Sequence, residues 1–463
     1  MKSAPSCGDK LHEECGVFGI LAPPGTAVAP DIATGLLALQ HRGQEAAGMS
    51  VSRTDGPRGN LLTKKGPGLV AEVFSESDMV RLNGNIGIGH VRYSTAGGSV
   101  PENAQPIAMN YIKGSLAVVH NGNIMNAKEL KDHQLHRGQA HVTTSDTEVL
   151  AYEIITARLH SPSIEEAVIR AAGNLRGGYA CLIMSPRKLV GIRDPYGIKP
   201  LVLGKKGDAW LLASESAAFQ AVGAELIRDI EPGEVVVVDE SGARSIRTLC
   251  GKPPAHCVFE YIYFARNDSV IDGIEVRTAR FQAGRALARQ SSVEADIVAG
   301  VPDSGLVAAE GFAAQSGLPF GLIFHKNSYV GRSFIKPTDA ERQAAVHRKL
   351  SVIKSAVEGK RIVLIDDSIV RGTTMRQIID MLRAAGARQV HVRISSPPFL
   401  HPCYYGTDVP TDRRLIASGH STEEVRARIG ADSLAYLNLD DLPAMVGGLG
   451  LCTACFTGKY PVR

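Results

Sequence analysis

The chain has 463 residues, which is more than a single hydrophobic core usually supports, so we expect two or three domains. Hydrophobic residues make up 44% of the chain, but no apolar run is long enough to cross a bilayer, and this excludes a membrane-spanning protein. The net charge of +4 is spread without a basic tract, so nucleic acid is not an expected partner. The first fourteen residues hold no apolar secretion segment, and we therefore expect a cytoplasmic protein.

The first half of the chain is dense in short apolar runs separated by turn signals. These runs predict strands of layered antiparallel sheets at 15–20, 85–94, 115–122, 179–184 and 234–239. Helices are predicted over 32–39 and after Ser145, where Ser145-Asp146-Thr147-Glu148 has the form of a capping box. This pattern indicates an α+β domain that ends near residue 250.

From residue 251 onward the pattern changes to strand, loop and helix. The segment GKPPAH at 251–256 is the expected linker, because it combines Pro and Gly with a break in periodicity. Strands are predicted within 296–305, 361–374 and 389–396, and helices follow the first two. The region 251–463 is therefore predicted to form an α/β domain with a mostly parallel, doubly wound sheet.

The stretch RIVLIDDSIVRGTT at 361–374 joins an apolar strand, two acidic residues and a loop that enters a helix. The N–H groups and hydroxyls of such a loop favour a phosphate, whereas the paired carboxylates suit sugar hydroxyls or magnesium. An ordinary strand, turn and helix is the structural alternative. The stretch resembles the signature of type I phosphoribosyltransferases, in which the acids hold the ribose of phosphoribosyl pyrophosphate and the loop holds its 5-phosphate. The resemblance assigns substrate binding to Asp366, Asp367, Ser368, Arg371, Gly372, Thr373 and Thr374.

Two further segments match the same family. Asp303-Ser304-Gly305 matches its pyrophosphate loop, so Ser304 is expected to help Asp366 and Asp367 position magnesium, although the triplet alone would be only a helix N-cap. The basic stretch 326–350 reads as a solvated loop. The family has a mobile flap at this point that covers the diphosphate, and the candidate contacts are Lys326, Tyr329 and Arg332.

Cys15 stands at the head of the first predicted strand, where an isolated cysteine would usually be a core residue. The same half of the chain also contains the motifs HRGQEAAG, HVRYSTAG, HNGNI and SDTE, which together resemble the N-terminal nucleophile class of glutamine amidotransferases. The resemblance implies that a propeptide, residues 1–14, is removed and that the α-amine of Cys15, with a pKa of about 8, acts as the base.

The same resemblance gives roles to four further residues. Arg92 and Asp146 match the groups that hold the α-carboxylate and α-amine of glutamine. Asn121 and Gly122 match the oxyanion hole, in which a side-chain amide and a backbone N–H face the developing negative oxygen. For Asn121-Gly122 alone, a type I′ hairpin turn is the structural alternative.

Four cysteines form a candidate metal site. Cys452 and Cys455 form a CxxC pair, which alone would indicate zinc, a redox pair or chance. Together with Cys257 and Cys403 they match the cysteines of family members that carry one 4Fe-4S cluster. Zinc in a four-cysteine site stays open as the alternative.

The two halves together resemble the amidophosphoribosyltransferase family. This resemblance implies an enzyme that transfers ammonia from glutamine to phosphoribosyl pyrophosphate, giving 5-phosphoribosylamine in the first committed step of de novo purine synthesis. It also implies a homotetramer that purine nucleotides inhibit. The alternatives are an inactive nucleotide-sensing regulator of the same fold, and another glutamine-dependent enzyme that aminates a sugar phosphate.

Overall fold

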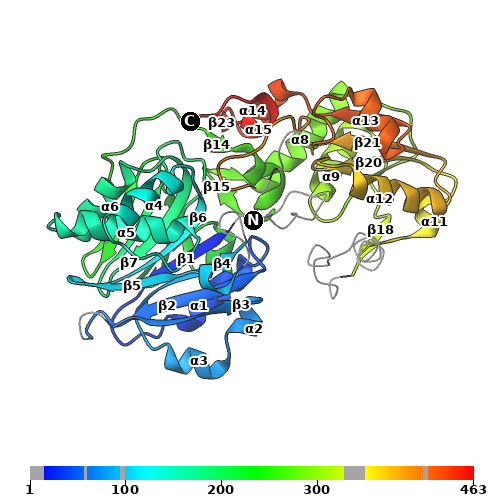
Figure 1. Cartoon of the computed structure of the whole chain (residues 1–463). Coiled ribbons are helices and arrows are strands. Elements are labelled where there is room, and N and C mark those ends of the chain that lie inside the picture. The colour runs from blue at the N-terminus through cyan, green and yellow to red at the C-terminus, as the bar shows by residue number, and fades with distance from the viewer. Residues whose placement is uncertain are drawn as a thin grey trace.

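The computed structural model describes residues 15–56, 60–93, 100–327, 350–407, 409 and 415–462. Figure 1 shows two parts, the first coloured from blue to green and the second from green to red. None of the helices in these ranges is both long and apolar enough to cross a membrane.

The first part contains two antiparallel sheets. The seven strands of one sheet lie in the order β11 (Glu225–Asp229), β9 (Val202–Lys206), β10 (Ala209–Ala213), β1 (Gly16–Leu21), β4 (Ile86–Arg92), β2 (Ala46–Ser52) and β3 (Leu62–Pro67). The six strands of the other lie in the order β13 (Gly242–Ile246), β12 (Val235–Asp239), β8 (Leu189–Arg193), β7 (Gly177–Met184), β6 (Gly114–Ile124) and β5 (Ile107–Tyr111).

These sheets stack face to face, and helices cover both outer faces (Figure 1). The helices of the first sheet are α1 (Ala29–Ala38), α2 (Val70–Val73), α3 (Glu76–Arg81) and α7 (Ala217–Val222), and those of the second are α4 (Ala127–His136), α5 (Asp146–Leu159) and α6 (Ile164–Ala172). Every residue of β1 is buried because its alternate side chains enter different cores. Phe18 and Ile20 pack toward the helices, whereas Val17 and Leu21 pack toward the second sheet.

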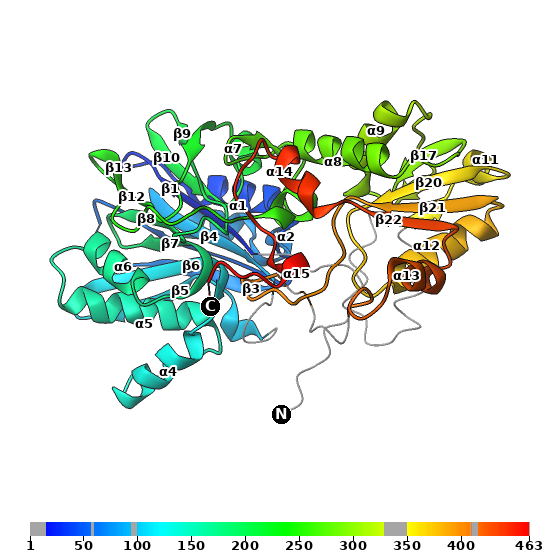
Figure 2. The same ribbon diagram turned by 90° about the horizontal axis from the view of Figure 1, so that it is seen from above.

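The second part is built on a four-stranded parallel sheet. Its order is β17 (Ile297–Gly300), β20 (Arg361–Asp366), β21 (Gln389–Ile394) and β22 (Ser433–Tyr436). Helices α8 (Val276–Gln290) and α9 (Gly305–Ser316) cover one face, and α12 (Thr373–Ala384) and α13 (Thr422–Ile429) cover the other, as Figure 2 shows. Such a sheet carries its ligands at the carboxyl ends of its strands.

Short elements complete both parts. The first part has a 3₁₀ turn at Pro101–Asn103. The second part has three short strand pairs, which are β14 (His256–Cys257) with β23 (Leu451–Cys452), β15 (Val270–Ile271) with β16 (Ile274–Glu275), and β18 (Phe324–Lys326) with β19 (Leu350–Val352). It also has helices α11 (Lys354–Val357), α14 (Leu442–Met445) and α15 (Ala454–Thr457), a π-helix (Glu260–Phe264) and a 3₁₀ turn at Leu439–Asp441.

The predicted fold class, an α+β domain of layered antiparallel sheets followed by an α/β domain with a parallel sheet, is confirmed. Residues 251–255, within the predicted linker, have no regular secondary structure. The domain boundary stays a prediction, and residues 1–14 lie outside the described ranges.

One local prediction was wrong, and one structural alternative is ruled out. The capping box at Ser145 does not form: Ser145 accepts from the N–H of Thr147, while Glu148 accepts from Val142 and Thr143 of the preceding loop. The hairpin alternative for Asn121-Gly122 also fails, because both residues lie inside β6, paired with β7.

Candidate active sites

The predicted nucleophile lies buried at the start of β1. The Cys15 thiol donates to the carbonyl of Tyr93 at 3.4 Å, and this carbonyl follows the end of β4, the neighbour of β1 in the sheet. Burial raises the pKa of the Cys15 thiol to about 11. The thiol is therefore protonated at neutral pH, and attack on a substrate requires a base beside it.

Charges of both signs lie close enough to Cys15 to act on its thiol. Arg92 lowers the pKa of the thiol, whereas Asp146 and Glu45 raise it. Arg92 ends β4 and lies 3.9 Å from Glu45, and Asp146 is the first residue of α5. The structure therefore brings together the two residues that were predicted to hold glutamine.

Asp146 is held as a carboxylate. Its Oδ2 accepts from the N–H of Ile124 at 3.1 Å, and its Oδ1 lies 3.6 Å from Nδ1 of His120. Burial by itself would raise the pKa of Asp146, but the charge and hydrogen bond of His120 and the backbone N–H groups outweigh it, and the pKa is lowered. An ionised carboxylate is the group that an α-ammonium requires.

The predicted oxyanion residues lie on β6 of the second sheet, and the same strand contacts Asp146 through the N–H of Ile124. The Asn121 side chain is fully buried, and neither its Nδ2 nor its Oδ1 has a hydrogen-bond partner among the described residues. A buried amide without partners costs about 1–3 kcal/mol, so its retention points to a ligand that completes it. Gly122 has φ +133°, and a Cβ there would lie 2.1 Å from the carbonyl oxygen of Gly178, so only glycine fits.

Sequence reasoning missed Arg42, to which it gave no role. The guanidinium is fully buried and donates from Nε to the carbonyl of Cys15 at 3.1 Å. Its Nη1 donates to Glu215 at 2.5 Å, and its Nη2 donates to Glu260 at 2.6 Å. The motif HRGQEAAG contained the signal, but its buried partners are 173 and 218 residues away in the chain.

The second site is formed where β17 and β20 end side by side in the parallel sheet. Gly300 pairs with Ile365, so the loops that follow the two strands meet at one edge. Ser304 donates to Oδ1 of Asp367 at 2.5 Å, and Ser368 donates to its Oδ2. Asp366 and Asp367 are both buried. The structure therefore joins the two loops that the sequence predicted to share one substrate.

The remaining loop residues lead into α12. Gly372, with φ +85°, precedes the first helical residue, Thr373, and no side chain caps the helix. The first N–H groups of a helix and its dipole favour an anion. Arg371, Thr373 and Thr374 lie at this end, as the phosphate prediction requires.

The flap is described only in part. Lys326 ends β18 and forms an ion pair with Asp303, beside the predicted pyrophosphate loop. Tyr329 and Arg332 lie outside the described residues. Sequence reasoning gave no role to Tyr263, whose pKa is raised by burial and next by the charges of Asp367 and Asp366.

The four predicted cluster cysteines come from three segments that meet in space. Cys257 on β14 pairs in register with Cys452 on β23. After burial, the largest influences that raise the pKa of Cys455 are Cys403 and Cys452. The Cys403 loop also lies at this point, because the N–H groups of Leu400 and His401 both bond to the Cys455 carbonyl.

Within the described part of the chain, no three His, Cys, Asp or Glu side chains form a group that could hold a metal ion. Four thiolates can bind one zinc ion or a 4Fe-4S cluster, so the identity of the metal stays a prediction.

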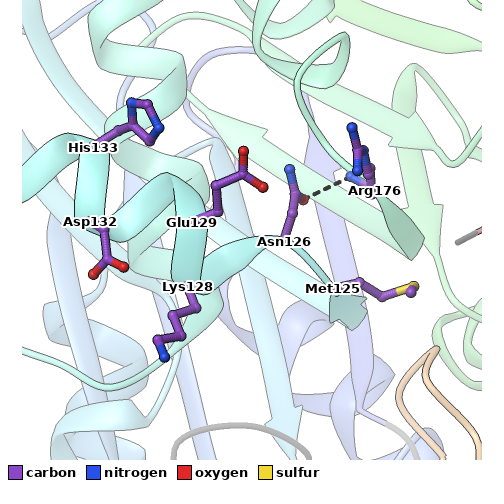
Figure 3. Close-up of a pocket in the computed structure, with 7 residues that line it drawn as sticks. All are labelled: Met125, Asn126, Lys128, Glu129, Asp132, His133 and Arg176. Atoms are coloured by element: carbon purple, nitrogen blue, oxygen red, sulfur yellow. Dashed lines mark hydrogen bonds between the residues drawn. The ribbon is translucent and has the colours of Figure 1, made fainter.

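A surface pocket of about 560 Å³ contains none of the predicted site residues. Figure 3 shows its lining from α4 and the segment before it, with the N–H of Arg176 bonded to Asn126 across it. The lining residues are Met125, Asn126, Lys128, Glu129, Asp132, His133 and Arg176. Charges of both signs are mixed there, and they define no substrate.

The fold and the two sites define a glutamine amidotransferase domain joined to a phosphoribosyltransferase domain. Residues 90–221 match the family described as glutamine amidotransferase domain, and residues 272–396 match the phosphoribosyl transferase domain. The chain is 48% identical over 461 residues to the amidophosphoribosyltransferase of Bacillus subtilis, covering 98% of this chain and 95% of that protein. It is 44% identical to the enzyme of the same name from Methanothermobacter thermautotrophicus, with the same coverage.

A solved structure gives the same result. The glutamine phosphoribosylpyrophosphate amidotransferase of B. subtilis, complexed with ADP and GMP, superposes with a TM-score of 0.89 at 46% identity over 97% of this chain and 98% of that one. The chain belongs to the amidophosphoribosyltransferase family, as the sequence predicted. The prediction of an enzyme of this kind is confirmed with it.

Proposed function

We propose that the chain transfers the amide nitrogen of glutamine to C1 of phosphoribosyl pyrophosphate, giving 5-phosphoribosylamine and pyrophosphate in purine synthesis. The observation that carries this proposal is that one chain holds both halves of the chemistry. Cys15 lies among the charges that fit an amino acid, and Asp366 and Asp367 lie at a sheet edge that fits a sugar phosphate.

In the first half-reaction, removal of residues 1–14 frees the α-amine of Cys15. This amine takes the thiol proton and the thiolate attacks the glutamine amide carbon, which explains how a thiol with a pKa near 11 can react at neutral pH. Asn121 and the N–H of Gly122 face the resulting oxyanion. Collapse returns the proton to the leaving ammonia, and water then hydrolyses the thioester to glutamate.

In the second half-reaction, ammonia attacks C1 and the C–O bond to pyrophosphate breaks. Asp366 and Asp367 would hold the ribose, the loop from Ser368 to Thr374 the 5-phosphate, and Lys326 with the flap the diphosphate. Magnesium would be held by Ser304 and the two aspartates and, when bound, would neutralise diphosphate charge.

The regulator alternative is less favoured, because a sensor has no use for a buried Asn121 amide that lacks hydrogen-bond partners among the described residues. We further propose one 4Fe-4S cluster on Cys257, Cys403, Cys452 and Cys455, a cytoplasmic homotetramer, and inhibition by purine nucleotides. The complex of the B. subtilis protein with ADP and GMP supports the last of these.

Pyrophosphate release tests the proposal when it is measured with glutamine and, separately, with ammonium salts at raised pH. Cys15→Ala is expected to lose glutamine-dependent turnover by about 10³-fold or more and to keep ammonia-dependent turnover. Asp367→Asn is the matched variant and is expected to reduce both. A Cys15→Ala protein that still used glutamine would overturn the assignment, and mass spectrometry of the mature chain should find Cys15 at its N-terminus.

A further inference from the structure

A loop of the second domain, residues 403–407, lies against the oxyanion strand of the first domain. Gly406 has φ +111°, and a Cβ there would lie 2.9 Å from the carbonyl carbon of Gly122 and 3.1 Å from its Cα and O. The two backbones are therefore in direct contact, with no room for a side chain between them. The loop and Gly122 are 284 residues apart in the chain, so sequence proximity does not explain the contact.

Two neighbouring contacts fix the loop in register with the strand pair β6 and β7. Asn123 donates from Nδ2 to the Tyr404 carbonyl at 2.8 Å. On β7, a Cβ at Gly178 would lie 3.1 Å from the Cβ of Tyr405. The loop therefore crosses both strands at the point where Gly122 takes its positive φ.

The loop is also held from behind. The Tyr405 hydroxyl donates to the Val462 carbonyl at 2.8 Å, and the Val462 N–H bonds to the same hydroxyl at 3.0 Å. The Tyr460 hydroxyl donates to the Pro402 carbonyl at 2.7 Å. The C-terminal segment thus holds the loop through three hydrogen bonds. The loop, residues 403–407, therefore forms a supported wall against β6.

We infer that Gly406 is a positioning residue for glutamine hydrolysis: its backbone packs against the Cα and carbonyl group of Gly122 and so fixes the residue whose N–H is proposed to face the oxyanion. Gly122 pairs with Tyr179 of β7 on one side, and no described strand pairs with it on the other side. The wall of the second domain supplies the constraint, so the glutaminase site is complete only when both domains are in place. This inference rests on the proposed role of Gly122.

The test compares Gly406→Ala with Gly251→Ala. Gly251 has a similar φ of +105°, but a Cβ there meets nothing within 4 Å, so it carries the same backbone strain without the contact. Gly406→Ala is expected to lower kcat for glutamine hydrolysis by about tenfold to 100-fold, approaching the loss of one oxyanion donor. KM for glutamine should stay within about twofold, since Arg92 and Asp146 are untouched, and ammonia-dependent turnover should be unchanged. Gly251→Ala should keep all three.

Asn123→Ala provides a second variant in case Gly406→Ala does not fold. It removes the 2.8 Å tether without adding an atom, and it should lower kcat for glutamine about threefold to tenfold, the loss expected of one hydrogen bond. Unchanged glutamine kinetics in a folded Gly406→Ala protein would overturn the inference, as would a parallel loss of both activities. If Cys15→Ala retained glutamine turnover, the proposed function itself would fail, which is a separate result.

Discussion

Replacement of Arg42 by Met should destabilise the first domain strongly. The guanidinium forms buried ion pairs with Glu215 and Glu260, and Met would remove it from both carboxylates and leave Glu215 with His41. Removing one partner of a buried pair costs about 3–5 kcal/mol, because an uncompensated charge stays in a medium that solvates it poorly. Domains of this size are stable by only about 5–15 kcal/mol, so the loss is a large share of the total.

Urea unfolding followed by fluorescence measures this loss directly. The chain has one tryptophan, Trp210 on β10. This strand neighbours β1 in the first sheet, so the emission of Trp210 reports unfolding of the first domain. Arg53→Met is the matched control, because Arg53 is exposed and, among the described residues, pairs only with exposed Asp55 at 3.2 Å, so no measurable change is expected. Adding Glu260→Gln to Arg42→Met should recover part of the loss by removing one of the two carboxylates that lose the guanidinium.

A loss below about 1 kcal/mol in Arg42→Met would refute this reasoning, since it would mean that water or a rearranged side chain replaces the guanidinium. The kinetics give an independent check. Arg42 also holds the Cys15 carbonyl. In Arg42→Met, glutamine-dependent turnover should therefore fall further than ammonia-dependent turnover, when both are measured without denaturant at a temperature where the wild type and the variant are folded.

Three further results are expected. Burial opposes ionisation of Glu215, but His41 and then Arg42 outweigh burial and lower the pKa of Glu215 below its ordinary value of 4.5. The ionised Glu215 therefore stabilises the fold fully above pH 4.5, and this stabilisation is lost as pH falls toward the folded pKa. Glu215→Gln should lower the free energy of unfolding at pH 7 and make it depend less on pH in the acid range, as measured by urea titrations. Asp146→Asn should raise KM for glutamine about tenfold to 100-fold with little change in kcat, because a charged hydrogen bond to substrate contributes about 1.5–3 kcal/mol; an unchanged KM would remove Asp146 from the glutamine site. Wild-type protein should be brown, with absorbance near roughly 400 nm and about four irons per chain, and Cys403→Ser should lose both; a colourless wild type with one zinc would contradict the cluster.

The sequence predicted the fold class and most strands because the relevant signals are local. The apolar runs at 15–20 and 361–366 read the same in isolation as in the folded sheets, and the acidic pair that follows the second run must lie at the carboxyl edge of any parallel sheet. The wrong prediction, the capping box at Ser145, concerns hydrogen-bond partners. Glu148 had an equally short route to Ser145 and to the 142–143 loop, and the sequence contains nothing that ranks them.

The buried partners of the sites could not be predicted for a related reason. Arg42 and Gly406 owe their roles to contacts with Glu260 and Gly122, which lie 218 and 284 residues away, and such contacts exist only after both domains are packed together. The sequence does not show which contacts a glycine or an arginine in a loop will make. Only the packed structure shows that these two residues meet Gly122 and Glu260.

One short segment belongs to both sites. Glu260 binds Arg42, which holds the carbonyl of Cys15, and three residues later the pKa of Tyr263 is raised by burial and next by the charges of Asp367 and Asp366. The segment forms a π-helix, and Arg280 of α8 donates to its Tyr261 carbonyl at 2.9 Å, which ties the segment to the second domain. Four consecutive residues therefore connect the buried ion pair behind Cys15 with the electrostatic surroundings of the acidic pair.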